Sequence, residues 1–266
     1  MSSPLDPFLS VLALTCRIRV PAPAEPDYGR ADFFLPLTGV LPGLAALGGW
    51  GLGSLVFPGP WLPALSALAA QYLAFNLFHL DGLADSADAG LALASPERRL
   101  AILKDPRVGV YGLFAAFLVL AARTAGLAAL GGRPGFPAVL LAAPVAGRFA
   151  AALVPLTARP ARPDGLGARM RDFRPQAVAS GLLAGLAPAF LAVLAGLPGE
   201  GSVLAGILGT GAGALAAGLA AGLGTAIFYR RRFGGFTGDA LGAAVELGEL
   251  AFLLGACAVA GTAGGA

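Results

Sequence analysis

Long apolar stretches joined by short polar connections make up most of this chain. Such stretches lie near residues 35–57, 61–80, 108–130, 136–158, 176–198, 202–229 and 240–262. Each is long enough for a helix to cross a hydrocarbon core of about 30 Å, which takes roughly 20 residues. The pattern therefore predicts an all-α fold, a polytopic transmembrane helical bundle of about seven crossings. We expect residues 1–266 to form a single integral membrane domain.

The first apolar stretch, at residues 8–15, is too short to cross a bilayer. No basic residue precedes it, and Arg17 and Arg19 follow it, so the sequence lacks the charge order of a cleaved signal peptide. We therefore expect a short N-terminal helix that lies at the membrane interface before the first crossing.

Composition indicates that lipid is the solvent of this protein. Hydrophobic residues make up 57% of the chain and charged residues only 12%, whereas a soluble domain carries about 25% charged residues. A soluble domain is thereby excluded, and we expect a lipid bilayer, and no nucleic acid, as a partner. The sequence leaves homo-oligomerisation open. Glycine and alanine are so common that small-residue spacings such as Gly218 to Gly222 are expected from composition alone.

Basic residues gather in alternate connections between the apolar stretches. If the N-terminus is cytoplasmic, nearly all of them fall on the cytoplasmic side, and Arg133 is left on the other. This positive-inside pattern predicts a multi-pass protein of the bacterial cytoplasmic (inner) membrane. Acidic residues contribute little to orientation, yet most acids of the connections fall on the same side. We therefore expect the active site to face the cytoplasm.

Three aspartates and the only histidine lie at the end of the second crossing, in His79-Leu-Asp-Gly-Leu-Ala-Asp-Ser-Ala-Asp88. On a helix, Asp81, Asp85 and Asp88 share one stripe because they occupy positions i, i+4 and i+7. Carboxylates so close repel one another, and Mg²⁺ would compensate their charge while bridging to a substrate phosphate. The alternative is a solvated helix end with unpaired acids. His79 lies off this stripe and could support a ligand, act as a general base or be an interfacial residue.

Two basic segments are candidates for phosphate binding. Lys104-Asp-Pro-Arg-Val-Gly-Val-Tyr-Gly112 combines two cations with a turn and two glycines, so its backbone N–H groups could cradle phosphate at a helix start. Arg159-Pro-Ala-Arg-Pro-Asp-Gly-Leu-Gly167, followed by Arg169, Arg171 and Arg174, concentrates guanidinium groups in one loop. An ordinary basic loop at the membrane edge explains the first segment equally well, and anionic lipid headgroups would attract the second.

The segment that enters the last crossing combines a helix start with acids. Thr237 occupies the place of an N-cap residue, and Asp239 and Glu246 share a helix face with Gly242 between them. Because acids inside a spanning helix are costly, we expect this face to turn toward the aspartate stripe of the second crossing. Gly242 would permit close approach.

Glu249 lies one turn beyond Glu246, and both acids fall inside the last crossing. Arg123 and Arg148, in the third and fourth crossings, are their candidate ion-pair partners. A role of these acids in the site is favoured over a purely structural ion pair.

Taken together, these segments resemble the cobalamin synthase family, the adenosylcobinamide-GDP ribazoletransferases. The similarity rests on residues 78–88, 104–109, 164–167 and 234–249, which follow one another in order. It extends to residues 19–23, to Arg30 and to residues 36–39, and so covers nearly the whole chain. Departures from the family pattern occur at Ser86, Ala89, Pro106 and Tyr111, and none of them removes a carboxylate.

The resemblance implies the last step in assembly of a corrinoid nucleotide loop. The adenosylcobinamide phosphoryl group would pass from adenosylcobinamide-GDP to α-ribazole or α-ribazole 5′-phosphate, giving adenosylcobalamin or its 5′-phosphate and GMP. The resemblance also implies a need for Mg²⁺. Attack of a ribazole hydroxyl on a pyrophosphate needs charge neutralisation and positioning, and no covalent protein intermediate.

On this basis each candidate residue receives an expected role. The expected metal ligands are Asp81, Asp85, Asp88, Asp239 and Glu246. The expected catalytic residues are His79, Asp81 and Asp85, and the sequence does not choose the general base among the histidine and the carboxylates. The expected substrate- and phosphate-binding residues are Arg30, Lys104, Arg107, Arg162, Gly165, Gly167 and Thr237.

Two other functions compete with this interpretation. A CDP-alcohol phosphotransferase also places aspartates on membrane helices and cleaves a pyrophosphate, but its signature requires a different aspartate spacing followed by Ala-Arg. An ion-coupled transporter would explain charged residues inside crossings. Transporters, however, place their sites near the midplane and contain internal repeats, whereas these acids concentrate at helix ends and the chain shows no repeat.

Overall fold

The protein is a bundle of long helices, as the computed structural model shows for residues 5–28, 30–170, 172–196 and 200–263. Arg171 and part of the connection near residue 199 lie outside these ranges. No β-strand occurs within them. Seven helical segments of the described chain are long and apolar enough to cross a membrane: Ala31–Val56, Trp61–Leu91, Val110–Leu130, Phe136–Thr157, Pro175–Gly196, Val203–Phe233 and Gly238–Gly261. The predicted polytopic bundle is confirmed.

The first two spans each contain more than one helix. In the first, α2 (Ala31–Thr38) meets α3 (Val40–Val56) at Gly39. In the second, α4 (Trp61–Gln71) passes through a π-helix (Tyr72–Asn76) into α5 (Leu77–Leu91). The second span therefore ends at Leu91 rather than near residue 80. The aspartates of α5 occupy one side of the helix, while leucine and alanine are buried on the other. The helix therefore continues through this polar segment, because its buried side still packs against the bundle.

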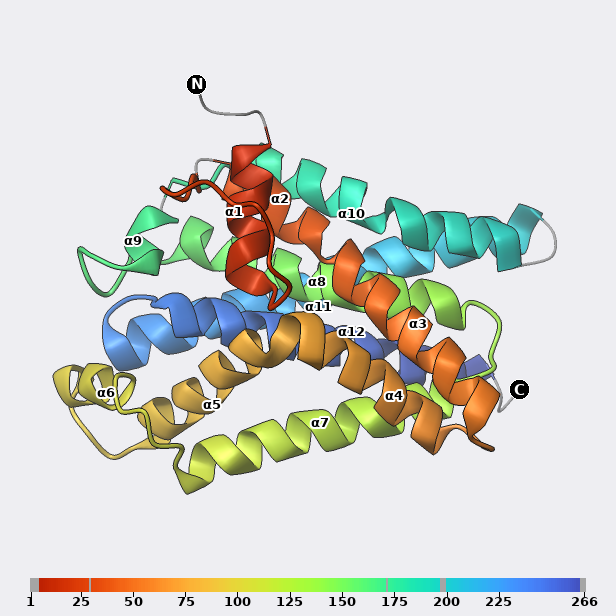
Figure 1. Cartoon of the computed structure of the whole chain (residues 1–266), viewed down its shortest axis with the longest axis horizontal. Helices are drawn as coiled ribbons and strands as arrows, with labels where there is room; N and C mark the ends of the chain where they lie inside the picture. Colours follow the sequence, from red (N-terminus) through yellow and green to blue (C-terminus); the bar gives the residue numbers. More distant parts are fainter. Residues whose placement is uncertain (1–4, 29, 171, 197–199, 264–266) are drawn as a thin grey trace.

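Five further helices complete the bundle, and three short ones flank it. The long helices are α7 (Val110–Leu130), α8 (Phe136–Thr157), α10 (Pro175–Gly196), α11 (Glu200–Phe233) and α12 (Gly238–Ala263). The short helices are α1 (Asp6–Thr15), α6 (Pro96–Ile102) and α9 (Leu166–Arg169). In Figure 1 α1 lies across the long helices. It packs on α2 through an edge-to-face pair of Phe8 and Phe34, with ring centroids 5.6 Å apart. A short N-terminal helix is thus confirmed.

Helix α8 is the centre of the bundle. Of an 18-residue window in its span, 89% is buried, against 44% or less in every other span. Small residues allow its neighbours to approach closely. A Cβ at Gly147 would lie 2.5 Å from the carbonyl oxygen of Val245 in α12, and a Cβ at Gly222 of α11 would lie 2.5 Å from that of Ala150. The spacing of Gly218 and Gly222 therefore marks a real helix contact, beyond what composition explains.

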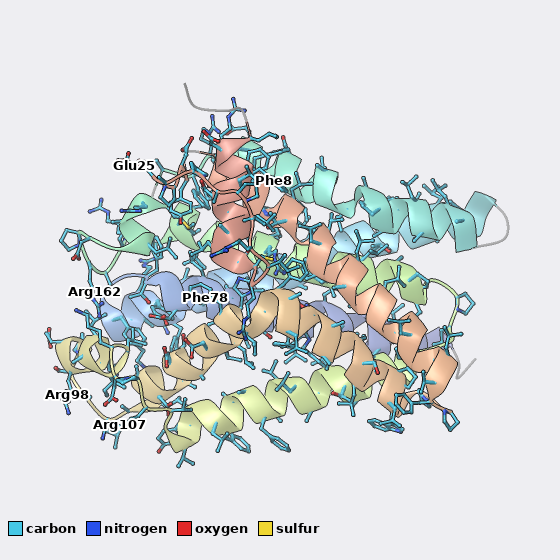
Figure 2. All side chains as sticks on the ribbon, viewed as in Figure 1. Phe8, Glu25, Phe78, Arg98, Arg107 and Arg162 are labelled. Carbon is cyan, nitrogen blue, oxygen red and sulfur yellow. The ribbon has the colours of Figure 1, made fainter. Side chains whose placement is uncertain are left out.

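One end of the bundle collects the basic loops, and we call it the basic end. Arg98, Arg107 and Arg162 lie there, on the left in Figure 2. At this end an isolated parallel bridge joins Pro160 to Phe236. The Phe236 N–H donates to the carbonyl oxygen of Arg159 at 2.9 Å, and the Ala161 N–H donates to that of Phe236 at 2.8 Å. The loop after α8 is thereby held against the loop that precedes α12.

Candidate active site

Helices α5 and α12 touch backbone to backbone at two glycines. A Cβ at Gly242 would lie 2.9 Å from the carbonyl oxygen of His79, and a Cβ at Gly82 would lie 3.0 Å from that of Asp239. Any side chain at these positions would push the helices apart. The expected approach of the last crossing to the aspartate stripe is confirmed at this contact.

Four aspartates gather at this contact, and we call Asp81, Asp85, Asp88 and Asp239 the aspartate cluster. Asp85 lies within electrostatic range of the other three, and Asp239 lies within range of Asp81. Asp81 is exposed and Asp85 is half-buried. Within the described part of the chain, neither of these two carboxylates accepts a hydrogen bond. Mutually repelling carboxylates that lack donors form a site that favours a cation.

The donor set of the aspartate cluster fits a hard cation such as Mg²⁺. This ion takes one or two protein carboxylates and completes its octahedron with water and substrate phosphate. Among the residues that the structure describes, no three His, Cys, Asp or Glu side chains are grouped closely enough to hold a metal ion by themselves. The cluster therefore suits an ion that the substrate helps to bind, rather than a complete protein cage.

Asp88 caps a neighbouring helix, a role that the sequence analysis did not anticipate. Its carboxylate accepts hydrogen bonds from the N–H groups of Gly109, at 2.7 Å, and Gly112, at 2.9 Å. Both belong to the start of α7, where N–H groups lack partners inside the helix and favour a negative charge. These are the N–H groups that the sequence suggested for phosphate. In the structure they bind Asp88, whose assignment as a metal ligand stays a prediction.

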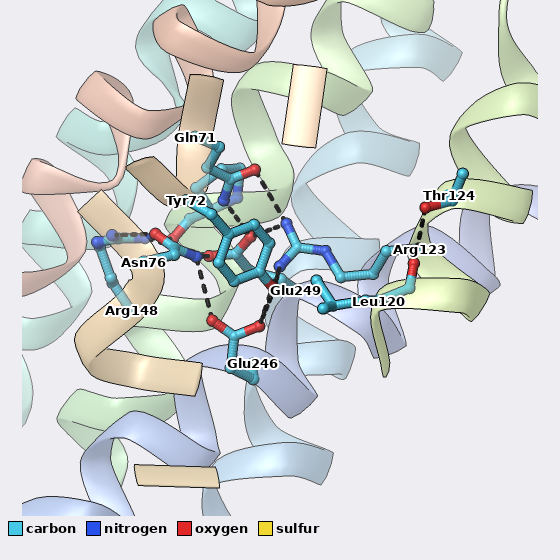
Figure 3. Close-up of polar contacts among 10 residues, drawn as sticks. Gln71, Tyr72, Asn76, Leu120, Arg123, Thr124, Arg148, Glu246 and Glu249 are labelled. Atoms are coloured by element: carbon cyan, nitrogen blue, oxygen red, sulfur yellow. Dashed lines mark hydrogen bonds and ion pairs between the residues drawn. The ribbon is translucent and has the colours of Figure 1, made fainter. Parts of the chain in front are cut away.

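Glu246 belongs to a second polar cluster, inside the bundle (Figure 3). We call it the buried network, and its members are Gln71, Tyr72, Asn76, Arg123, Arg148, Glu246 and Glu249. Glu246 accepts hydrogen bonds from Arg123 at 3.1 Å, from Asn76 at 3.2 Å and from the Tyr72 hydroxyl. Every one of these donors is itself buried.

Glu249 is satisfied in the same way. It accepts hydrogen bonds from Gln71 at 2.6 Å, Asn76 at 2.9 Å and Arg148 at 3.2 Å, and it forms an ion pair with Arg123. The candidate ion pairs with Arg123 and Arg148 are therefore present. This geometry favours structural pairing over the role in the site that the sequence suggested. The expected metal role of Glu246 stays a prediction that the geometry does not support.

His79 is buried away from open space. It is 3% exposed, and its Nδ1 has no hydrogen-bond partner in the described chain. It lines a cavity of about 20 Å³ together with residues of α1, α8 and α12. That volume holds one water molecule and no ribose. A general base must come within hydrogen-bond distance of the substrate hydroxyl. The cavity beside His79 is too small to admit that part of the substrate.

The predicted phosphate-binding cations differ in what they contact. Arg162 donates to the carbonyl oxygen of Leu100 at 2.6 Å and lies within electrostatic range of Asp239. Arg107 forms two hydrogen bonds with Asp105, at 2.6 and 2.9 Å. These bonds lower the pKa of the Asp105 carboxyl to about 2. Arg162 therefore lies near the aspartate cluster without bonding to it in the described chain, whereas Arg107 is paired with its own neighbour.

Arg30 and Lys104 have exposed side chains without a polar partner among the described residues. Arg30 lies at the start of α2 and Lys104 beyond the end of α6, and no contact joins either to the aspartate cluster. Gly165 precedes α9 with a φ of +91°, a conformation that suits glycine. Gly167 leaves room for Phe236, whose ring a Cβ would approach to 3.2 Å. The two glycines thus shape the loop that carries Arg162.

Hydroxyl groups surround the Asp239 end of the cluster. Thr237 immediately precedes α12, as expected for an N-cap, and its hydroxyl donates to the Asp239 carboxylate at 2.9 Å. The hydroxyls of Ser86 and Tyr229 lie 2.6 Å apart, and the sequence analysis had not singled out Tyr229. Gln71, Tyr72 and Asn76 were not expected from the sequence either, although polar residues inside the apolar run 61–80 are a signal for such a cluster.

Fold and site together define an integral membrane protein in which two helices far apart in sequence gather aspartates at one basic end of the bundle. A profile of the cobalamin-5-phosphate synthase family matches residues 7–257, and the chain belongs to this family. No solved structure matches it significantly.

Three curated relatives show how far this similarity extends, and each bears the name adenosylcobinamide-GDP ribazoletransferase. The relative from Pseudomonas paraeruginosa is 39% identical over 258 residues, covering 96% of this chain and 98% of its own. That from Pseudomonas fluorescens is 36% identical and covers 90% and 93%. That from Klebsiella pneumoniae strain 342 is 36% identical and covers 93% and 97%. The likeness therefore spans the whole bundle, including both helices of the aspartate cluster.

Proposed function

We propose that this protein is an adenosylcobinamide-GDP ribazoletransferase. It transfers the adenosylcobinamide phosphoryl group from adenosylcobinamide-GDP to α-ribazole or α-ribazole 5′-phosphate, giving adenosylcobalamin or its 5′-phosphate and GMP. The observation that carries this proposal is 39% identity, over 96% of the chain, to a relative named for this reaction. The aspartate cluster supports it, because phosphoryl transfer depends on positioning and charge stabilisation.

The chemistry forms one bond and breaks one. The ribazole hydroxyl oxygen attacks the phosphorus that carries adenosylcobinamide, and the bond from that phosphorus to the bridging oxygen of the pyrophosphate breaks. GMP leaves with that oxygen. The hydroxyl proton passes to a carboxylate, for which we propose Asp81 or Asp85. Both have oxygens without a hydrogen-bond donor in the described chain, whereas His79 is enclosed.

We propose that carboxylates from Asp81, Asp85 and Asp239 would hold Mg²⁺ together with the substrate pyrophosphate, since no three of these side chains are grouped closely enough to hold it alone in the described chain. When bound, this ion neutralises pyrophosphate charge and stabilises the leaving oxygen. The chain supplies the rest of the arrangement: Gly82 and Gly242 bring the carboxylates of α5 and α12 together. Arg162 adds a positive charge beside Asp239, where a substrate phosphate would be attracted.

The same proposal places the protein in a bacterial inner membrane with its basic end in the cytoplasm. Lys and Arg are retained on the cytoplasmic side during insertion, and they gather at this end (Figure 2). Nothing favours the alternatives. The charged residues that suggested transport are paired with one another in the buried network.

Purified protein in a lipid bilayer, supplied with adenosylcobinamide-GDP and α-ribazole, tests the proposal. We expect release of GMP in step with corrinoid product when Mg²⁺ is present, and loss of both when EDTA removes it. Turnover that persists in EDTA would contradict the metal assignment only. No turnover with either acceptor in the presence of Mg²⁺ would contradict the reaction itself.

A further inference from the structure

A cavity of about 990 Å³ opens at the basic end. Its wall comes from the end of α8 and the loop after it, from α9 and from the end of α11. Its charged lining residues are three arginines, Arg159, Arg162 and Arg230, and one acid, Asp172. The excess of positive charge favours an anionic ligand, and the volume suits a small molecule of nucleotide size.

The backbone around this cavity is fixed on two sides. The bridge between Pro160 and Phe236 holds the arginine-bearing loop. At Gly235 a Cβ would lie 2.6 Å from the carbonyl oxygen of Arg159, so a larger residue would break this contact. Arg162 is held through its hydrogen bond to Leu100. Arg159 and Arg162 therefore project from a supported loop and Arg230 from the last turn of α11, so less entropy is lost when they bind a ligand.

Arg162 also connects the cavity to the aspartate cluster. It lines the cavity wall and lies within electrostatic range of Asp239. A ligand whose phosphate reached Arg162 would thus have its reacting end beside the proposed metal site. The cavity and the aspartate cluster therefore have Arg162 as a common neighbour.

Arg159 and Arg230 have no side-chain partner among the described residues, in contrast to several arginines that are paired. Arg107 pairs with Asp105, Arg123 with Glu246, and Arg174 with Asp32. The guanidinium groups of Arg159 and Arg230 make no ion pair within the described ranges, and both are exposed at the cavity. A planar guanidinium group binds a phosphate through two parallel hydrogen bonds, and these two are free to do so.

We propose that this cavity binds the 5′-phosphate of a ribonucleotide, with Arg159 and Arg230 as its phosphate-binding residues. The inference rests on the proposed function, which involves two groups of this chemistry. One is the guanylate part of adenosylcobinamide-GDP, which leaves as GMP, and the other is the acceptor α-ribazole 5′-phosphate. Both are 5′-phosphorylated ribonucleosides.

Direct binding tests the cavity without any need for turnover. The full-length protein is placed in bilayers of phosphatidylcholine, which carries no net charge, and titrated calorimetrically with GMP and with α-ribazole 5′-phosphate. Arg159→Gln and Arg230→Gln should each raise the Kd for one of the two ligands about tenfold or more, the loss expected for one charge-assisted hydrogen bond. Arg230→Lys, which keeps the charge but not the paired geometry, should give an intermediate Kd.

Arg231→Gln is the matched control. It removes the same charge from the same end of α11, but Arg231 does not line the cavity, so its Kd values should equal those of the unmodified protein. Equal losses in Arg231→Gln and Arg230→Gln would overturn the proposal, because general surface charge would then explain both. Unchanged Kd values in Arg159→Gln and Arg230→Gln would overturn it as well. So would a finding that neither GMP nor α-ribazole 5′-phosphate binds to the unmodified protein.

Steady-state kinetics separates the two ligand sources. If the cavity takes the guanylate part, the variants raise the KM for adenosylcobinamide-GDP with either acceptor and weaken inhibition by GMP. If it takes the acceptor, they raise the KM for α-ribazole 5′-phosphate and leave that for α-ribazole unchanged. An unmodified protein that binds these ligands but has no transferase activity would contradict the proposed function and leave the cavity assignment intact.

Discussion

Arg123 of α7 and Glu246 of α12 lie 3.1 Å apart, nitrogen to oxygen, although 123 positions separate them in the chain. Their side chains are 4% and 0% exposed. Arg148 and Glu249 add one further charge of each sign, so two guanidinium groups face two carboxylates. Together with Gln71, Tyr72 and Asn76, these residues join four spans in the interior of the bundle.

Replacing Glu246 by Gln tests whether the buried network is structural. The substitution leaves the positive charges of Arg123 and Arg148 without full compensation, and breaking a buried ion pair costs about 3 kcal/mol or more. We expect a lower unfolding temperature in detergent, with activity per folded molecule close to that of the unmodified protein. Normal stability combined with a large loss of turnover would instead place Glu246 in the catalytic site.

A double substitution provides the control for this prediction. Arg148→Gln and Glu249→Gln each leave one buried charge unpaired, whereas the double variant removes one charge of each sign. Because the two side chains contact each other at 3.2 Å, their effects should be coupled. The double variant should lose less stability than the sum of the two single variants.

Gly242→Ala should abolish most activity through geometry. The added Cβ would lie 2.9 Å from the His79 carbonyl oxygen and 3.1 Å from its Cα, and backbone atoms cannot move aside. Helices α5 and α12 would separate, and Asp239 would withdraw from Asp85. A misplacement of about 1 Å can lower turnover about 100-fold. Gly255→Ala, in the same helix but with nothing within 4 Å of its Cβ, is the matched control. Equal activity of the two variants would refute a role for the helix contact.

Asp85→Asn should lose at least about 100-fold in kcat while retaining the fold, because removing even a supporting group of a metal site commonly costs 10- to 100-fold. Asn keeps the shape of Asp but not its charge. Glu25→Gln, in an exposed loop at another part of the surface, is the control for loss of one negative charge and should behave as the unmodified protein. Near-normal Mg²⁺-dependent turnover of Asp85→Asn would show that the aspartate cluster is not the metal site.

The orientation in the membrane can be tested with two equivalent glycines. Gly132 and Gly234 have φ angles of +77° and +75°, and a Cβ at either meets nothing within 4 Å. Substituting each by cysteine, after replacing the free Cys16 and Cys257, should therefore strain the two turns to a similar extent. In intact cells an impermeant thiol reagent should label Cys at position 132 and not at position 234. The opposite result would place the basic end outside.

The spans could be predicted from the sequence because a run of about 20 apolar residues leaves the backbone no alternative to a helix in lipid. The buried network could not. Gln71 and Asn76 are five residues apart, which places them about 140° apart on an α-helix. The π-helix, with its i to i+5 hydrogen bonds, brings such positions onto one face, and both side chains reach Glu249.

The aspartate stripe could be predicted because its spacing of four and three residues matches the α-helical repeat. The approach of Asp239 to this stripe could also be predicted, because Gly242 lies on the same helix face and leaves room for a neighbouring helix. The capping role of Asp88 and the arginine-lined cavity could not be predicted, because both depend on contacts between distant loops. Asp88 meets Gly109 across the loop that contains α6, and Pro160 pairs with Phe236.

The π-helix at Tyr72–Asn76 also bears on how the length of this protein can vary among its relatives. A π-helical turn accommodates one residue more than the α-helical turn that would replace it. Deletion of a single residue here would therefore let α4 run directly into α5, with the aspartates still facing α12. Such a deletion would, however, take Gln71 and Asn76 off their common face. Relatives whose second span is one residue shorter should consequently have a neutral residue in place of Arg148 or Glu249.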